Sequence, residues 1–152
     1  MNRDNGARTD KRAAVEDAVR RGLRMYMTRA TVFSYQVAED AGLGHTDLHC
    51  LGLLQLQGPM SAGDLARCTG LTTSAITAVI DRLERSGLAR REPDPADRRR
   101  VIVRLDDTNF ARRIVPLYAA RSAGEAPVLA RFTEEELAVV RDFLHALDEA
   151  DR

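Results

Sequence analysis

Three consecutive arginines, Arg98 to Arg100, lie between the turn-forming run PDPAD and the β-branched run VIV. Guanidinium groups bind phosphates, and an arginine on a thin ribbon can enter the narrow minor groove of DNA, where the negative potential is strongest over A·T tracts. Asp97 precedes them and can orient the Arg99 guanidinium through a local ion pair. The chemistry that this stretch favours is contact with a nucleic-acid backbone and groove.

A helix with small hydroxyl side chains is expected just before these arginines. The run TTSAITAVIDRLERSG predicts a helix over 72–86 whose apolar stripe is opposed by threonine and serine, with Arg82 and Arg85 at the far end. Hydroxyls near a helix start hydrogen-bond phosphates or base edges, and the free N–H groups there suit phosphate. The expected DNA contacts of helix and ribbon are Thr72, Thr73, Ser74, Thr77, Arg82, Asp97, Arg98, Arg99 and Arg100.

The elements around these residues form a helix-turn-helix followed by a hairpin. In SAGDLARCTG, Ser61 and Asp64 have the spacing of a capping box and Gly70 is placed to end a short helix, two residues before the next one. LARRE and RRRVIVRL, separated by PDPAD, predict a β-hairpin. An exposed polar face on a structural helix would show the same periodicity, but the arginine-tipped hairpin directly after it favours DNA.

The rest of the chain is predicted to be helical. The expected helices cover residues 12–40, the segment from Thr46 as N-cap to Gly58, residues 108–130 with interruptions at Pro116 and Pro127, and a last helix opened by Thr133 and Glu136. The second of these is apolar on most sides and is expected to be central. The fold class is therefore mainly α with a small β-hairpin wing (α+β).

Charge is distributed unevenly along the 152 residues, although the net charge is zero. Between Arg82 and Arg104 there are eight arginines and four acidic residues, whereas residues 133–151 hold seven acids and one arginine. A basic region beside an acidic end presents a locally basic surface within a neutral total. No apolar run reaches the length of a membrane span and the N-terminus lacks a secretory pattern, so a cytoplasmic protein is expected.

Catalytic, metal and redox chemistry find little support. The sequence contains no GxSxG, P-loop or HExxH motif, the three histidines lack metal-ligand spacing, and capping of the next helix explains the acid pair Asp106 and Asp107. No enzyme, cofactor or metal is expected. Cys50 and Cys68 lie in helices beside apolar residues, where a free thiol behaves as a small buried hydrophobe. A thiol-based redox sensor is kept as an alternative function.

The run from Ser61 to Leu105 resembles the winged helix-turn-helix of the MarR family of bacterial transcription regulators. DPADRRRVIVRL is similar to the family's wing signature, in which Asp97 and Arg99 take the places of an Asp-x-Arg pair. The segment from Thr72 to Arg82 then falls on the recognition helix. The resemblance covers nearly the whole chain, and the two prolines of the penultimate helix depart from it.

This resemblance implies a homodimer that represses transcription from a palindromic operator. The first and last helices of two chains would interlock, with residues 1–45 and 107–152 forming a dimerisation domain around a DNA-binding domain at 46–106. Two recognition helices would then lie one DNA turn, roughly 34 Å, apart. A winged-helix module that binds protein without DNA is the alternative, although such a surface would favour aromatic anchors.

A small aromatic or phenolic ligand is expected to release the DNA by fixing a half-site spacing that no longer fits. The resemblance places its site between the dimer helices and the DNA-binding core. Aromatic rings with a few polar atoms suit such a pocket, although stripe residues also serve as plain core. The candidate ligand-binding residues are Met25, Tyr26, Phe33, His49 and Tyr118.

Overall fold

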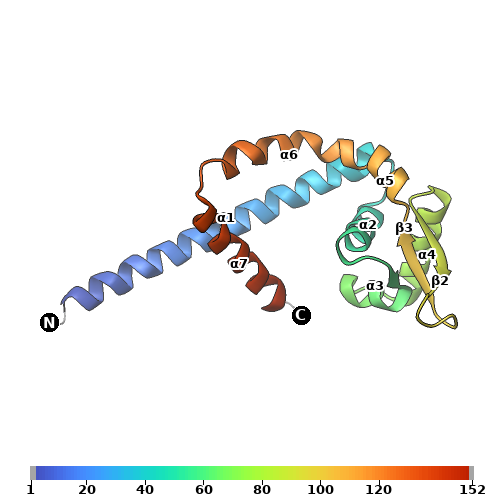
Figure 1. Ribbon diagram of the computed structural model, residues 1–152, viewed down its shortest axis with the longest axis horizontal. Helices are drawn as coiled ribbons and strands as arrows, with labels where there is room; N and C mark the ends of the chain where they lie inside the picture. The colour runs from blue at the N-terminus through green and yellow to red at the C-terminus, as the bar shows by residue number, and fades with distance from the viewer. Residues whose placement is uncertain (1–2, 151–152) are drawn as a thin grey trace.

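The computed structural model describes the backbone of residues 3–150 and the side chains of residues 10–119 and 124–150. Its helices are α1 (Arg3–Asp40), α2 (His45–Gln57), α3 (Ala62–Thr69), α4 (Thr73–Arg85), α5 (Asp107–Arg113), α6 (Val115–Leu129) and α7 (Glu134–Ala150). Its strands are β1 (Met60–Ser61), β2 (Ala89–Pro93) and β3 (Val101–Leu105). Helices α2 to α4 and the sheet gather at the C-terminal end of α1 (Figure 1).

The sheet has three antiparallel strands in the order β1-β3-β2. The predicted hairpin is confirmed: Ala89 pairs with Leu105 and Pro93 with Val101. Strand β1 was not expected from the sequence, since its two residues carry no alternating pattern. Its pairing of Met60 with Val103 attaches the start of the helix-turn-helix to the base of the wing.

One hydrophobic cluster underlies the helix-turn-helix and the sheet. The apolar stripe predicted for residues 72–86 is buried as expected, each of its members being at most 2 % exposed. Helix α2 contacts α1, α3, α4 and β3, which confirms its central position. The largest fully buried side chains are Leu51, Leu65, Ile76, Ile80, Leu83, Leu88 and Ile114.

The turn between α3 and α4 is built by residues that the sequence singles out. The Ser61 hydroxyl accepts from the backbone N–H of Asp64 while the Asp64 carboxylate accepts from the Ser61 N–H, which confirms the capping box. Gly70 ends α3 at φ +68°, a conformation that side chains rarely adopt. Thr72 then caps α4 by accepting from the Ala75 N–H. The positions of both helices are therefore fixed locally.

Two predicted helix starts were wrong. Helix α1 begins at Arg3, well before residue 12, so it is longer than its apolar stripe indicates. Helix α2 begins at His45, with Gly44 as its N-cap and no side-chain hydrogen bond at that position, so Thr46 is not the cap. Thr46 lies within the first turn of the helix, two residues after the N-cap.

Proline divides the penultimate helical region as the sequence predicts. Helix α5 ends at Arg113 and α6 begins at Val115, with Pro116 in its first turn, where a missing N–H costs no hydrogen bond. Pro127 lies inside α6, which ends two residues later at Leu129. The capping box at the start of the last helix is also confirmed, since Thr133 and Glu136 exchange both hydrogen bonds.

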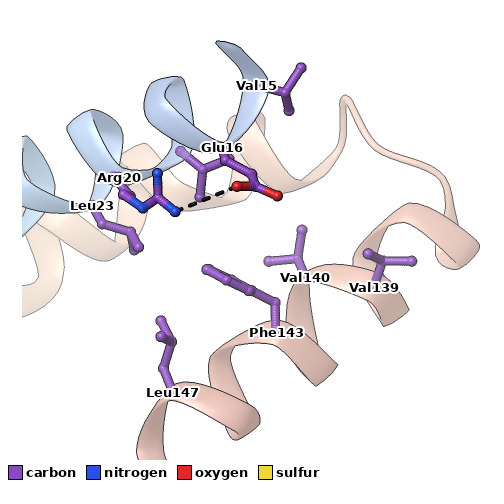
Figure 2. A pocket seen from close by; sticks show the side chains of 9 residues that line it. Val15, Glu16, Arg20, Leu23, Val139, Val140, Phe143 and Leu147 are labelled. Carbon is purple, nitrogen blue, oxygen red and sulfur yellow. Dashed lines mark hydrogen bonds and ion pairs between the residues drawn. The ribbon is translucent and has the colours of Figure 1, made fainter. Parts of the chain in front are cut away.

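The terminal helices leave much of their apolar surface uncovered. Helix α6 runs back along α1, and α7 then crosses near the middle of α1 (Figure 1). Between α1 and α7 lies an open apolar concavity of about 510 Å³, into which Phe143 points (Figure 2). No described residue of α7 is buried. None of the described helices is both long and apolar enough to cross a membrane.

Candidate nucleic-acid interface

The N-terminal half of α4 presents four exposed hydroxyl side chains. Thr72, Thr73, Ser74 and Thr77 are all exposed to solvent. Within this group the Thr72 and Ser74 oxygens lie 3.1 Å apart, and the Thr77 hydroxyl donates to the backbone oxygen of Thr73 at 2.9 Å. Because a hydroxyl that donates one bond keeps two lone pairs, these oxygens still accept from an approaching base edge. The face is polar and accessible to solvent.

Asp97 shapes the turn at the tip of the wing. Its carboxylate accepts from the backbone N–H of Arg99 at 3.0 Å, and its backbone oxygen accepts from the N–H of Arg100 at 2.8 Å. The predicted ion pair between Asp97 and the Arg99 guanidinium is wrong, because the carboxylate binds backbone N–H in an Asx-type turn. The guanidinium is thereby left exposed to solvent.

The three arginines of the wing tip all point into solvent or toward weak partners. Arg98, Arg99 and Arg100 are exposed, and among the described side chains only Arg100 approaches a carboxylate, that of Asp64 at 4.0 Å. Asp94 and Asp97 of the same turn accept from backbone N–H groups and not from these guanidinium groups, and they offset only part of the positive charge. A basic tip of this kind attracts a polyanion strongly.

Arg82 differs from the other expected DNA contacts. Its guanidinium binds the carboxylate of Asp47 on α2 in a fork, with Nη2 to Oδ1 at 2.6 Å and Nε to Oδ2 at 2.9 Å. The hydrogen bond from Arg82 to Asp47 raises the pKa of the guanidinium. Asp47 is the one charged residue among the buried side chains described, and no sequence motif predicted its role. A carboxylate on an otherwise apolar central helix was the available signal.

Phe33 and Tyr118 are the two candidate ligand residues that the structure brings together. Their rings meet edge to face with centroids 5.6 Å apart, which joins α1 to α6. Tyr118 also lines a concavity of about 560 Å³ with Gln55, Phe110, Val115 and Ala119. Burial raises the pKa of the Tyr118 phenol above its ordinary value.

The other three candidate ligand residues lie elsewhere. Met25 and Tyr26 are each 56 % exposed on α1. His49 is exposed on α2 and lines a separate concavity of about 310 Å³ with Thr46, Cys68, Thr69 and Leu71. This concavity shares no lining residue with the one at Tyr118. The five residues therefore do not form one pocket in the single chain.

The two thiols have different surroundings. Cys50 is fully buried, and burial, reinforced by the Asp47 carboxylate, raises its pKa to about 11. Cys68 is exposed on α3, so its predicted burial is wrong. Helix α3 turns Leu65 inward, and a residue three positions later lies at the edge of that face.

Among the described side chains no three His, Cys, Asp or Glu residues form a metal-binding cluster.

Comparison with known proteins identifies the family. The MarR family model matches residues 41–100. The chain is 36 % identical over 135 residues to the uncharacterized HTH-type transcriptional regulator YcgE of Bacillus subtilis (strain 168), covering 89 % of this chain and 87 % of that protein. This chain belongs to the MarR family. It is also 30 % identical to the HTH-type transcriptional repressor NicR of Pseudomonas putida, over 78 % of this chain and 75 % of that protein.

Solved structures agree with this assignment. A MarR family protein from Bacillus stearothermophilus superposes with a TM-score of 0.65 at 25 % identity, covering 92 % of this chain and 96 % of that one. A mutant of MepR from a multidrug resistant S. aureus isolate shares the fold with a TM-score of 0.72 at 20 % identity. The protein is thus a MarR-family, winged-helix transcription regulator of the DNA-binding class, mostly helical with a small antiparallel sheet. Its relatives are named as regulators and not as enzymes.

Proposed function

We propose that this MarR-family chain represses transcription as a homodimer on a palindromic operator and is released by a small aromatic or phenolic ligand. Its recognition helix α4 enters the major groove and its wing enters the adjacent minor groove. The proposed contacts are Thr72, Thr73, Ser74 and Thr77 on the helix, and Asp97, Arg98, Arg99 and Arg100 at the wing tip. Repression is in keeping with the name of its relative NicR.

This proposal rests on one observation: the winged helix exposes two polar surfaces of different chemistry, the hydroxyl face of α4 and the arginines of the wing tip. The hydroxyl face of α4 suits base edges, and the wing tip carries three exposed guanidinium groups, of which only Arg100 lies within 4.0 Å of a carboxylate among the described side chains. Both surfaces belong to one winged helix, since β2 follows the C-terminal end of α4 and leads to the wing tip. A protein-binding module would instead need apolar anchors at these positions.

Uncovered apolar side chains support the dimer. Along α7 the exposed apolar residues recur at helical spacing, and α1 carries a similar series. Monomers rarely expose contiguous apolar patches of such extent. A second copy placed on these helices would cover them and bring two recognition helices to one face of the duplex. The exposed apolar residues of the terminal helices include Val15, Val19, Val139, Val140, Phe143, Leu144 and Leu147.

The ligand is proposed to bind beside the Phe33–Tyr118 ring pair. The concavity at Tyr118 joins α2, α5 and α6, so an occupant there changes how the DNA-binding core sits on the dimer helices. Met25 and Tyr26 contribute where the second copy covers α1. His49 lines a separate concavity with residues of α3, so its proposed ligand contact would be made there and not beside the ring pair. Release follows because the ligand favours a half-site spacing that the operator does not match.

The proposal is tested by DNA binding of the full chain. Genome-wide mapping of bound sites supplies the operator, and fluorescence anisotropy measures its affinity over a series of salt concentrations. The logarithm of the binding constant is expected to fall steeply with the logarithm of salt, because several phosphates are neutralised per subunit. Arg99→Ala is expected to weaken operator binding by roughly 10-fold to 100-fold, the range for one lost base contact.

Arg131→Ala is the matched control, since Arg131 is an exposed arginine outside the winged helix. It is expected to leave operator affinity unchanged, and light scattering should show both variants in the same assembly as the wild type. Weak, salt-indifferent binding by the wild type would favour the protein-interaction module. Equal affinity of Arg99→Ala and wild type would remove the wing tip from the mechanism.

A further inference from the structure

The charged side chains in the C-terminal half of α4 are engaged within the protein. The segment DRLE, residues 81–84, contains Asp81, Arg82 and Glu84, and each of these binds a residue of another element. This contrasts with the N-terminal half of the same helix, where the hydroxyl side chains make only local contacts. The recognition helix therefore has one half that faces outward and one half that is tied to its own fold.

Arg82 ties α4 to α2. The Asp47 side chain is only 3 % exposed and is held by three hydrogen-bond contacts from the one guanidinium, which is itself 45 % exposed. A bidentate fork fixes both distance and angle between the two elements. Because a buried carboxylate is costly without its partner, the pair holds Arg82 in one orientation. Two of its nitrogens are thereby committed to the protein.

Arg91 ties the same half of α4 to the wing. Its backbone N–H donates to the Glu84 carboxylate at 2.7 Å, its Nη1 binds that carboxylate as well, and its Nη2 donates to Asp81 at 2.7 Å. Arg91 lies in β2, in register with Val103 at the centre of the hairpin. The wing and the recognition helix are consequently joined by one side chain and one backbone group.

The two ties lie on different sides of the helix. Asp81 and Glu84 are three residues apart and share a face, whereas Arg82 is turned by about 100° from Asp81. The buried apolar stripe sets which face of α4 points inward, and the two polar ties act on either side of that stripe against small rolls about the helix axis. With α2 on one side and β2 on the other, a roll that shortens one contact breaks the other.

We propose that Asp81, Arg82 and Glu84, with Asp47 and Arg91, form a two-sided clamp that sets the orientation of the recognition helix and of the wing. Arg82 is then a positioning residue and not the phosphate contact that its place in the sequence favours. Recognition of the DNA sequence is then confined to the N-terminal half of α4 and the wing tip. This inference rests on the proposed DNA-binding function and names which residues align its surface.

Substitution of Asp47 separates the two roles of Arg82, because the two roles predict opposite signs. If Arg82 is a phosphate contact, Asp47→Asn frees its charge and tightens operator binding, while Arg82→Gln flattens the salt dependence by about one unit of slope. If Arg82 is instead part of the clamp, Asp47→Asn and Arg82→Gln both weaken operator binding by roughly 10-fold to 100-fold, as for one lost base contact. The double variant is then no weaker than either single variant, and the salt slope is unchanged.

Affinity for a scrambled duplex distinguishes the two roles. It falls when a charge that binds phosphate is lost, and it stays the same when only the orientation of α4 is lost. Non-specific binding depends on phosphate neutralisation alone. If the clamp sets the orientation, each variant therefore has a lower ratio of operator affinity to scrambled-duplex affinity than the wild type. The affinity of each variant for the scrambled duplex stays within about 2-fold of the wild-type value. Failure of the proposed function appears in the wild type, as equal affinity for both duplexes. Failure of the clamp appears as variants that keep the wild-type ratio.

Arg82→Lys keeps the test decisive should Asp47→Asn not fold. Lysine retains the positive charge but lacks the planar fork, so a phosphate contact would survive this change. The clamp predicts that Arg82→Lys loses operator preference by the same factor as Arg82→Gln. Retention of full operator affinity by a folded Arg82→Lys protein, judged by circular dichroism and urea unfolding, would overturn the proposal.

The wing side of the clamp has a matched control in adjacent residues. Arg91→Gln removes the contacts to α4, whereas Arg90→Gln removes ion pairs to Glu92 and Asp106, which lie outside α4. Only Arg91→Gln should lower the affinity ratio.

A readout without DNA uses spin labels at positions 78 and 96, in a Cys50→Ala, Cys68→Ser background diluted with unlabelled chain. Arg91→Gln is expected to broaden the distance distribution between helix and wing. An unchanged distribution, or an equal change with Arg90→Gln, would overturn the wing side of the clamp.

Discussion

The recognition helix α4 and the last helix α7 have the same apolar pattern but opposite burial. The stripe of α4 is at most 2 % exposed at every position, whereas Val140, Phe143, Leu144 and Leu147 of α7 are 40–51 % exposed. Both helices begin with a side-chain cap and have apolar residues at three- and four-residue steps. The sequence pattern therefore predicts that the apolar face of each helix is covered, but it does not identify the residues that cover it.

The difference teaches which part of the protein is complete in one chain. Helix α4 is covered by α2, α3 and the sheet, all within residues 45–105, and the family model matches this stretch up to residue 100. Helix α7 lies against α1 across an open apolar concavity (Figure 2). A winged helix whose core is buried within one chain, and terminal helices whose apolar faces remain open, are the two features that the proposed homodimer requires.

The largest expected effect is loss of the dimer when a charge is placed in the apolar surface of α7. Phe143→Asp should raise the dimer dissociation constant by roughly 100-fold or more, because an unpaired carboxylate would be buried at the interface. Sedimentation equilibrium over a range of protein concentrations measures this. Leu56→Asp is the matched control, since Leu56 is an exposed leucine, 83 % accessible, on α2 of the winged helix. Equal weakening by both would end the distinction between the two regions.

A second prediction compares two leucines in these helices. Leu83→Ala in α4 should lower the free energy of unfolding by about 2–5 kcal/mol, since Leu83 is fully buried and leaves a cavity. Leu144→Ala in α7 should cost less than about 0.5 kcal/mol at concentrations where chains are separate. Urea unfolding at low and high protein concentration measures both.

The effect of Leu83→Ala should be the same at the two concentrations, because its cavity lies within one chain. That of Leu144→Ala should grow with concentration, because its partner surface is supplied by the second copy. If the change in unfolding free energy caused by Leu144→Ala were the same at both protein concentrations, α7 would already be fully packed in the single chain.

Local features of the fold were predictable from the sequence. The Ser61–Asp64 cap, the turn at Gly70 and the hairpin each depend on residues close together in the chain, and all three are confirmed. Strand β1 was missed because its pairing of Met60 with Val103 joins distant segments and its two residues show no periodicity. Tertiary pairing, and not propensity, makes it a strand.

The candidate site was predictable in residue type but not in partners. The sequence favours an exposed basic tip, and the structure has one; it also favours Arg82 as a solvent-facing charge, and the structure pairs it with Asp47, 35 residues away. Asp97 shows the same limit at short range, since a carboxylate beside an arginine can bind its guanidinium or its backbone N–H. Spacing along the chain does not distinguish these two geometries.

The smallest expected effect compares the capping boxes at the starts of α3 and α7. The hydrogen bond from the Ser61 hydroxyl is the main cause that lowers the pKa of Asp64, so folding stabilises the ionised carboxylate. That contribution is fully present above the unfolded pKa of about 3.9 and is lost as pH falls through the lower folded value. Asp64→Ala should therefore cost about 1 kcal/mol at pH 7.

Urea unfolding from pH 7 down to pH 3 checks this, and the curves of Asp64→Ala and wild type should converge at the acid end. Glu136→Ala is the matched variant, because Glu136 fills the same position in the box of α7 but is exposed and contacts only that helix's first turn. It should cost less than Asp64→Ala, since α3 packs Leu65 into the core while α7 has no buried residue. Parallel pH curves for Asp64→Ala and wild type would mean that the Asp64 carboxylate does not support α3.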